Sequence, residues 1–332
     1  MIVNTTKKII DLANRPKPEK YNILTFPTHE RYETQLCKTG HNFYSFRVEN
    51  APRWKKDQVP IPENYYILPE GTLVNNISYD FILIQSKFWQ FQIAQQLNQI
   101  LSLPTICLEH TLPTPQTFSQ SDIDQMRKMH GLVNVFISEY SQKVWGIDKN
   151  PTIIHHGIDS ELFSPRDVGT KEKILTVAND FINRDYCLNF KGWKRVTNGL
   201  PIRLVGDTKG LSVSAKSTND LVDEYNKCAV YFNSTTLSPI PTSLLEAMSC
   251  GCAVVSTATC MIPEIIKNGE NGFISNDENE LRQYIEKLLS DEDLRTKIGS
   301  AARQTIIEKF SEKNFIDKWN SLFNTIYEVA RK

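Results

Sequence analysis

The sequence has no excess of charge of either sign, because 38 lysines and arginines balance 38 aspartates and glutamates over 332 residues. A neutral total gives no support for a nucleic acid or an anionic membrane as the main partner, although a local basic patch could still exist. The sequence lacks the apolar run of roughly 18–20 residues that spans a bilayer, and its first twenty residues lack the pattern of a cleaved signal peptide. These absences predict a cytoplasmic protein with no transmembrane segment.

Metal-binding and disulfide patterns are also lacking. The seven cysteines are scattered, no C-x-x-C pair exists, and Cys250 and Cys252 form the only close pair. A zinc site needs several ligands at a characteristic spacing, so the sequence predicts no metal site. We expect free, buried thiols in a reducing compartment. Glycine and proline number 14 and 16, which is too few for a low-complexity chain.

What the chain does contain is a recurring order of short apolar strand, polar loop and helix. The strand segments are continuous apolar runs, which is typical of strands buried on both faces of a parallel sheet. Helical patterns over residues 87–101, 219–226 and 241–249 lie between some of them, and this alternation predicts an α/β fold. The expected strands are 21–26, 79–85, 104–109, 133–138, 151–155, 173–178, 202–206, 229–234, 253–257 and 272–275.

The strands form two series, separated by the polar stretch 164–169, which contains a proline and a glycine. Such a stretch suits a linker, so we expect two doubly wound halves of normal domain size. The last segment has the apolar spacing of an amphipathic helix and places three aromatic residues on one face, so it must dock on a domain. These residues are Phe315, Trp319 and Phe323.

The most informative segment is SPIPTSLLEAMSCGCAVVSTATCMIPEIIKNGENGFIS, residues 238–275. The N-terminus of the helix over 241–249 offers backbone N–H groups and a positive dipole end, which together favour an anion. Glu246 lies about one turn inside this helix, where its carboxylate could accept two hydrogen bonds from a ribose diol. From the spacing alone, a solvated helix carboxylate remains the simpler interpretation.

The same segment resembles the donor-binding signature of the retaining glycosyltransferases of family 4, which have the GT-B fold. The shared residues are Leu244, Leu245, Glu246, Ala247, Met248, Cys250, Gly251, Val254, Val255, Pro263, Glu264, Ile265, Ile266, Gly269 and Gly272. The resemblance implies two doubly wound Rossmann-like domains facing a cleft. Residues 1–165 would form the acceptor-side domain, with the C-terminal helix 313–332 packing back on it, and 166–312 the nucleotide-sugar domain. It also implies that Glu246 holds the ribose of the nucleotide.

One departure from the signature concerns the donor sugar. The family's first glutamate and the glycine after it would fall at Ser238 and Pro239. Ser238 has no charge, and Pro239 has no N–H group to donate. Either the donor sugar is held differently or activity is reduced, and the otherwise complete signature favours the first account.

Further matches extend the resemblance over both domains. His110 is placed like the histidine that reaches the donor sugar, and Lys191 like the lysine that pairs with the diphosphate, so these two are the candidate catalytic residues. Arg184 is the nearest arginine to the family's phosphate-binding position, although its spacing to Lys191 is longer. The candidate donor-binding residues are Glu246, Leu245, Leu244, Ser243, Thr242, Ser238, Arg184, Gly157 and Ser138.

The loop after the first strand departs furthest from the family, because it has no glycine. It reads Phe26-Pro27-Thr28-His29-Glu30-Arg31-Tyr32 in place of a Gly-Gly turn. Thr28, His29 and Arg31 could meet the donor phosphate or the acceptor. An ordinary strand-end loop with Thr28 capping a helix is equally compatible with these residues.

Retaining transfer does not require an obvious carboxylate base, because the leaving nucleoside diphosphate can itself take the acceptor proton. Lys191 and the N-terminus of the 241–249 helix would stabilise the leaving charge. The resemblance therefore implies a hexosyl- or pentosyltransferase that needs no metal or other cofactor. A UDP-sugar is the favoured donor, with GDP- and ADP-sugars as alternatives.

The acceptor and several rival functions stay open at this point. The acceptor could be a glycan or a lipid-linked sugar, and the stretch 47–56 is a faint basic, aromatic candidate for meeting it. A glycosyltransferase acting on a hydroxymethylated base of viral DNA is an alternative. The others are a GT-B sugar-nucleotide epimerase, a catalytically lapsed nucleotide-sugar-binding protein, and a two-lobed binding module.

Overall fold

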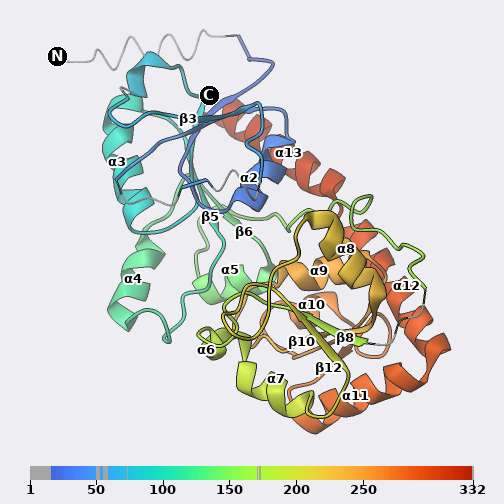
Figure 1. Cartoon of the computed structure of the whole chain (residues 1–332). Coiled ribbons are helices and arrows are strands. Elements are labelled where there is room, and N and C mark those ends of the chain that lie inside the picture. The colour runs from blue at the N-terminus through green and yellow to red at the C-terminus, as the bar shows by residue number, and fades with distance from the viewer. Residues whose placement is uncertain are drawn as a thin grey trace. The chain divides into compact units, whose positions relative to one another are not determined.

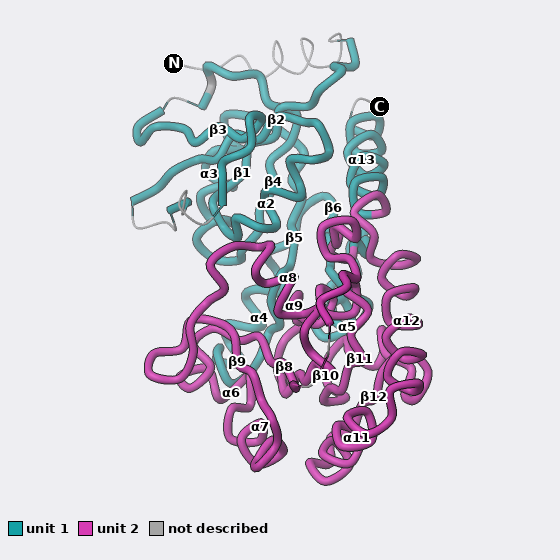
Figure 2. Tube along the Cα trace, turned by 45° about the vertical axis from the view of Figure 1, so that its right-hand side comes forward, with its two compact units in different colours: residues 1–154, 315–332 teal, residues 155–314 magenta. Residues whose placement is uncertain are grey.

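A computed structural model describes residues 16–49, 53–54, 59–72, 74–169, 171 and 173–330. The chain divides into two compact units, which Figure 2 distinguishes by colour. Unit 1 comprises Met1–Ile154 and Phe315–Lys332, and unit 2 comprises His155–Asn314. Each unit is an α/β assembly around its own parallel sheet (Figure 1).

Unit 1 holds a seven-stranded parallel sheet in the order β3-β2-β1-β4-β5-β6-β7. Its core includes Leu24, Ile82 and Cys107 on three adjacent strands. The strands are β1 Asn22–Thr25, β2 Asn42–Ser45, β3 Tyr65–Ile67, β4 Phe81–Ile84, β5 Thr105–Glu109, β6 Val133–Phe136 and β7 Pro151–Ile153. The helices are α2 Glu30–Cys37, α3 Trp89–Leu101, α4 Gln120–Lys128, α5 Glu139–Trp145 and the 3-10 turn η1 Val74–Asn76.

Strand order determines where this unit can bind a ligand. β1 lies between β2 and β4, so the chain leaves β1 toward one side of the sheet and later returns to the other. In doubly wound sheets, ligands bind outside the carboxyl ends of the strands at this reversal. The residues that follow β1, β4 and β5 therefore belong to the region where a site is expected.

Unit 2 holds a five-stranded parallel sheet in the order β12-β11-β10-β8-β9, whose reversal lies between β8 and β10. The strands are β8 Lys173–Val177, β9 Ile202–Val205, β10 Cys228–Asn233, β11 Ala253–Ser256 and β12 Phe273–Ile274. The helices are α6 Asp185–Leu188, α7 Phe190–Val196, α8 Thr218–Lys227, α9 Thr242–Ser249, α10 Ile262–Ile265, α11 Glu278–Ser290 and α12 Glu292–Lys309. The predicted α/β class and parallel sheets are confirmed.

The C-terminal helix, α13, spans Glu312–Val329, and its residues from Phe315 onward belong to unit 1. Its aromatic face is buried: Trp319 is fully inaccessible and donates its indole N–H to the Tyr32 hydroxyl at 3.2 Å. Phe323 stacks on Phe81 of β4 with ring centroids 5.6 Å apart. Burial of this face explains the aromatic spacing that the sequence shows.

Residues 155–165, which the sequence assigns to the first domain, belong to unit 2. Ile158 donates its N–H to the Phe310 carbonyl at 2.7 Å, and Ser249 donates its hydroxyl to the Phe163 carbonyl at 2.7 Å. Arg303 of α12 donates to the carbonyls of Ser160 and Phe163. These hydrogen bonds attach the segment to unit 2 before the linker-like composition begins.

Candidate functional site

The predicted donor site in unit 2 centres on α9, which follows the loop after β10. Glu246 is buried, with 4% of its surface exposed, and its Oε2 accepts a hydrogen bond from the Tyr225 hydroxyl at 2.8 Å. A solvated helix carboxylate is therefore excluded. A buried carboxylate needs hydrogen-bond partners, so Tyr225 of α8 holds Glu246 in a defined orientation one turn inside the helix. No motif in the sequence singles out Tyr225 for this role.

The N-terminus of α9 has no side-chain cap, because its N-cap residue is Pro241. Thr242 is exposed, and the half-buried Ser243 accepts a hydrogen bond from the Tyr231 hydroxyl at 2.9 Å. An uncapped helix start leaves backbone N–H groups and a positive dipole end for an anion. Leu244 and Leu245 are fully buried, so their side chains pack in the core and any ligand contact from them would use the main chain.

The loop that carries Ser238 is held from two sides. The Thr236 and Leu237 N–H groups both donate to the Cys187 carbonyl of α6, at 2.8 and 3.1 Å. On the other side, the Met261 N–H donates to the Pro239 carbonyl at 3.3 Å. Ser238 itself is half-buried. The position of the family's sugar-binding glutamate therefore lies in a loop that main-chain hydrogen bonds hold on both sides.

Arg184 and Lys191 lie just before and just after α6, the helix whose Cys187 carbonyl accepts hydrogen bonds from the Ser238 loop. Arg184 is the N-cap residue of α6. Lys191 is in α7, and its Nζ lies 3.2 Å from Asp185 Oδ2 while 77% of its side chain is exposed. The Lys191 backbone N–H and ammonium both lower the pKa of Asp185. An exposed ion pair of this kind is worth little, so Lys191 could exchange Asp185 for a phosphate at small cost.

Gly157 and Ser138 are both buried, and their surroundings give each of them a structural role. Gly157 is buried beside Ile158, which pairs with Ser311 in an isolated bridge. Ser138 is the N-cap residue of α5 in unit 1, and its Oγ accepts a hydrogen bond from the Ser141 N–H at 2.9 Å. The Ser138 side chain is fully buried. Helix capping accounts for Ser138 without a ligand.

In unit 1, His110 comes directly after β5 and is joined to the neighbouring strand ends by Gln85, which follows β4. His110 Nε2 lies 3.1 Å from Gln85 Oε1, and the Gln85 amide also bonds to Thr25 and to Glu33 of α2. The ring of His110 meets that of Tyr32 edge to face, with centroids 4.5 Å apart. The predicted catalytic histidine is thus fixed at the carboxyl edge of the sheet by a buried polar network.

The glycine-free loop after β1 joins this network. Thr28 accepts a hydrogen bond from the Gln90 amide at 3.1 Å, and His29 is the N-cap residue of α2 without a side-chain cap. The His29 ring lies edge to face with that of His110, with centroids 5.6 Å apart, and burial lowers the pKa of His29. Arg31 is exposed. The proposed helix-capping role of Thr28 is wrong, since His29 occupies that position.

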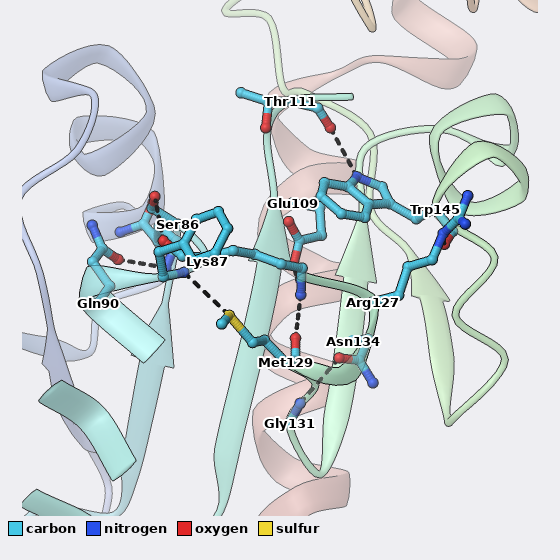
Figure 3. Close-up of polar contacts among 12 residues, drawn as sticks. Ser86, Lys87, Gln90, Glu109, Thr111, Arg127, Met129, Gly131, Asn134 and Trp145 are labelled. Carbon is cyan, nitrogen blue, oxygen red and sulfur yellow. Dashed lines mark hydrogen bonds and ion pairs between the residues drawn. The ribbon is translucent and has the colours of Figure 1, made fainter. Parts of the chain in front are cut away.

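A buried ion pair that no sequence motif indicated lies next to this network. Lys87 Nζ is 2.7 Å from Glu109 Oε1, and each side chain is 4% exposed (Figure 3). The ammonium also donates to the Met129 carbonyl and lies 5.3 Å from the centre of the Trp145 ring. Burial raises the pKa of Glu109, and Lys87 opposes that shift. Glu109 is the last residue of β5 and directly precedes His110, so the pair joins the end of β5 to the segment after β4.

The described part of the chain contains no group of three or more histidine, cysteine, aspartate or glutamate residues placed to hold a metal ion. Among the helices of the described residues, none is long and apolar enough to cross a membrane. Of the basic stretch 47–56, residues 50–52 and 55–56 lie outside the described residues.

The segment that contains α9 is similar to a known protein family. Residues 212–305 match the family model described as glycosyl transferases group 1. Over 90 residues the chain is 31% identical to N-acetyl-alpha-D-glucosaminyl L-malate synthase of Bacillus anthracis, covering 26% of this chain and 23% of that protein. An uncharacterized glycosyltransferase of Methanocaldococcus jannaschii is 22% identical over 92% of this chain and 90% of its own length. The first curated relatives are matched over only 17–32% of their length.

Among solved structures, the chain is similar to Anabaena HepE in complex with UDP. The TM-score is 0.75 at 15% sequence identity, and the match covers 92% of this chain and all of the HepE chain. The chain has the GT-B fold. In this GT-B chain, Thr28 and His29 follow β1 and Ser238 follows β10, which are strands beside the reversal of their sheets. Ser138 and Gly157 instead follow β6 and β7, toward the other edge of the first sheet.

Proposed function

We propose that the protein is a retaining glycosyltransferase, which moves a sugar from a nucleoside diphosphate donor to an acceptor hydroxyl. The observation that carries the proposal is the arrangement of α9. Glu246, held by Tyr225, lies one turn inside a helix whose start is uncapped, at the sheet edge where doubly wound folds bind ligands. A carboxylate so placed can accept hydrogen bonds from both hydroxyls of a ribose while the diphosphate binds at the helix N-terminus.

The donor proposal draws further support from relatives. HepE has been solved in complex with UDP and with UDP-glucose, so a UDP-sugar is the donor we favour for this chain. Lys191 would contact the diphosphate, because breaking its exposed ion pair with Asp185 costs little free energy. The N-terminus of α9 and Lys191 would stabilise the charge of the leaving nucleoside diphosphate, which takes the acceptor proton itself.

On the acceptor side, His110 is the proposed contact with the donor sugar, and Thr28, His29 and Arg31 are proposed to meet the phosphate or the acceptor. Ser238 would leave the sugar without the usual carboxylate, so the donor sugar would be held by other groups. For the acceptor class we propose a glycan or a lipid-linked sugar. Two matched relatives are glycosyltransferases of capsular polysaccharide biosynthesis and of poly(ribitol-phosphate).

The test is incubation of the protein with a panel of UDP-, GDP- and ADP-sugars, followed by quantification of free nucleoside diphosphate and by NMR of the released sugar. Slow release from one donor, with the sugar's anomeric configuration retained, supports the proposal. An inverted product would refute the retaining mechanism. Binding of nucleotide with no turnover of any donor, with or without glycan acceptors, would refute the enzyme assignment.

A further inference from the structure

The side-chain amide of Gln85 uses both of its hydrogens within unit 1. Gln85 Nε2 donates to Thr25 Oγ1 at 3.1 Å and to Glu33 Oε1 at 2.7 Å. All three side chains are buried, and Glu33 is 1% exposed. The Gln85 main chain is fixed as well, because its N–H donates to Gln90 Oε1 at 2.8 Å. The amide therefore has a single defined orientation.

That orientation determines what His110 can do. With both amide hydrogens donated, the atom of Gln85 that faces His110 is the acceptor Oε1, 3.1 Å from His110 Nε2. A contact with an acceptor oxygen requires the hydrogen of the imidazole to be on Nε2. In the neutral ring, the other nitrogen, Nδ1, is then a hydrogen-bond acceptor.

Glu33 is the group that selects this orientation. The Thr25 hydroxyl can donate or accept, so it tolerates either orientation of the amide. Above its pKa, which burial raises to about 8, the Glu33 carboxylate can only accept. If the Gln85 amide were turned over, its carbonyl oxygen would face Glu33 Oε1 at the present separation of 2.7 Å. Two acceptor oxygens at this distance in a buried site repel each other, and both would lack a hydrogen bond.

We propose that Glu33 and Gln85 are positioning residues, which hold His110 in the tautomer with its hydrogen on Nε2 and so present Nδ1 as the acceptor for a sugar hydroxyl. The inference rests on the proposed function for the identity of the hydroxyl. The choice of tautomer rests on the geometry of unit 1 alone. Tautomer selection by a second residue is a known way to orient a histidine for its task.

The test is the ¹⁵N–¹H spectrum of the His110 imidazole in the full-length protein, assigned with a His110→Gln variant. Spectra are recorded at about pH 9, where Glu33, whose pKa burial raises to about 8, is ionised. We expect a single tautomer, with the hydrogen on Nε2, in the wild type. The Glu33→Gln variant replaces the acceptor-only group by an amide that can donate or accept, so both tautomers should be populated.

Thr25→Val is the matched control. It removes the other partner of the same Gln85 amide, in an equally buried position, and leaves Glu33 in place. The spectrum of His110 should remain that of the wild type. A wild-type spectrum with the hydrogen on Nδ1, or a Glu33→Gln spectrum identical to that of the wild type, would overturn the proposal.

Transfer activity separates this inference from the proposed function. If turnover is observed at about pH 9, where Glu33 is ionised, Glu33→Gln should lower kcat by about tenfold, as expected for loss of one oriented hydrogen bond, whereas Thr25→Val should leave it nearly unchanged. If no donor is turned over, the proposed function fails while the spectra still decide the tautomer. If Glu33→Gln changes the tautomer but not kcat, the role of Nδ1 toward the sugar is refuted.

Discussion

The buried ion pair between Lys87 and Glu109 allows a quantitative test of how unit 1 supports His110. Replacing Lys87 by Met preserves most of the side-chain volume but leaves the Glu109 carboxylate without its cation. Both side chains are 4% exposed and 2.7 Å apart, so solvent cannot replace the lost partner. Breaking a buried pair by removing one member costs about 3–5 kcal/mol, and we expect a loss of this size for Lys87→Met.

The double variant Lys87→Met/Glu109→Leu removes both charges together. Replacement of a buried pair by apolar residues of similar volume is often neutral or stabilising. The lost contacts with the Met129 carbonyl and the Trp145 ring will take back part of that gain, because a desolvated cation–π contact is worth about 2 kcal/mol. The double variant should therefore recover most of the stability that Lys87→Met loses.

The assay is urea denaturation at neutral pH, monitored by circular dichroism and by tryptophan fluorescence. Trp145, whose ring lies next to Lys87, contributes to the fluorescence signal. Arg195→Met is the control, since Arg195 forms an equally short pair with Glu278 at 2.6 Å but is 62% exposed. An exposed pair contributes about 0–1 kcal/mol. If Lys87→Met costs no more than Arg195→Met, or if the double variant is less stable than the single one, the reasoning is refuted.

Two further predictions concern Glu33 and Gly299. Burial raises the pKa of Glu33 to about 8 from its ordinary value of 4.5, so between these values the folded state retains a proton that the unfolded state releases. As the pH rises through this window, the free energy of unfolding should therefore fall by about 1.4 kcal/mol per pH unit. The pH series of Glu33→Gln should lack this slope, and equal slopes in the two proteins would contradict the assignment. A Cβ at Gly299 of α12 would collide with the Gly251 carbonyl, so Gly299→Ala should lower the midpoint of thermal unfolding by several degrees through overpacking. Ser300→Ala, at the exposed neighbouring position of the same helix, is the control. An unchanged midpoint for Gly299→Ala would show that α12 does not pack closely on the turn at Gly251 that follows α9.

Sequence patterns predicted the interior strands because those strands are continuous apolar runs. β2 and β3 were missed, since they lie toward the edge of the sheet, where every second residue of β2 is only half-buried and only Tyr65 of β3 is buried. Strands of this kind have a weaker signal than strands buried on both faces. The boundary at 165 was placed by composition, whereas hydrogen bonds to α12 and to Ser249 decide where residues 155–165 belong.

In the candidate site too, residues within one segment were predicted, whereas residues that act through long-range contacts were not. Glu246 and the start of α9 were predicted because the signature lies within one continuous segment. Tyr225, Gln85 and Glu33 act through contacts between segments far apart in the chain, and local pattern carries no information on such pairs. Leu244 and Leu245 belong to the signature, yet their side chains are fully buried. A residue can therefore match a binding motif because the helix must pack, with no side-chain contact to the ligand.

The most direct test of the account is calorimetric titration of UDP into the wild type, Glu246→Ala and Tyr225→Phe. Tyr225→Phe removes the same internal hydrogen bond as Glu246→Ala but keeps the carboxylate. If Glu246 accepts hydrogen bonds from the ribose hydroxyls, Glu246→Ala should weaken binding by about 1.5–3 kcal/mol, roughly ten- to a hundredfold. Tyr225→Phe keeps the carboxylate and loses only its orienting partner, so it should weaken binding by less than Glu246→Ala does. Equal affinity of Glu246→Ala and the wild type would contradict the account.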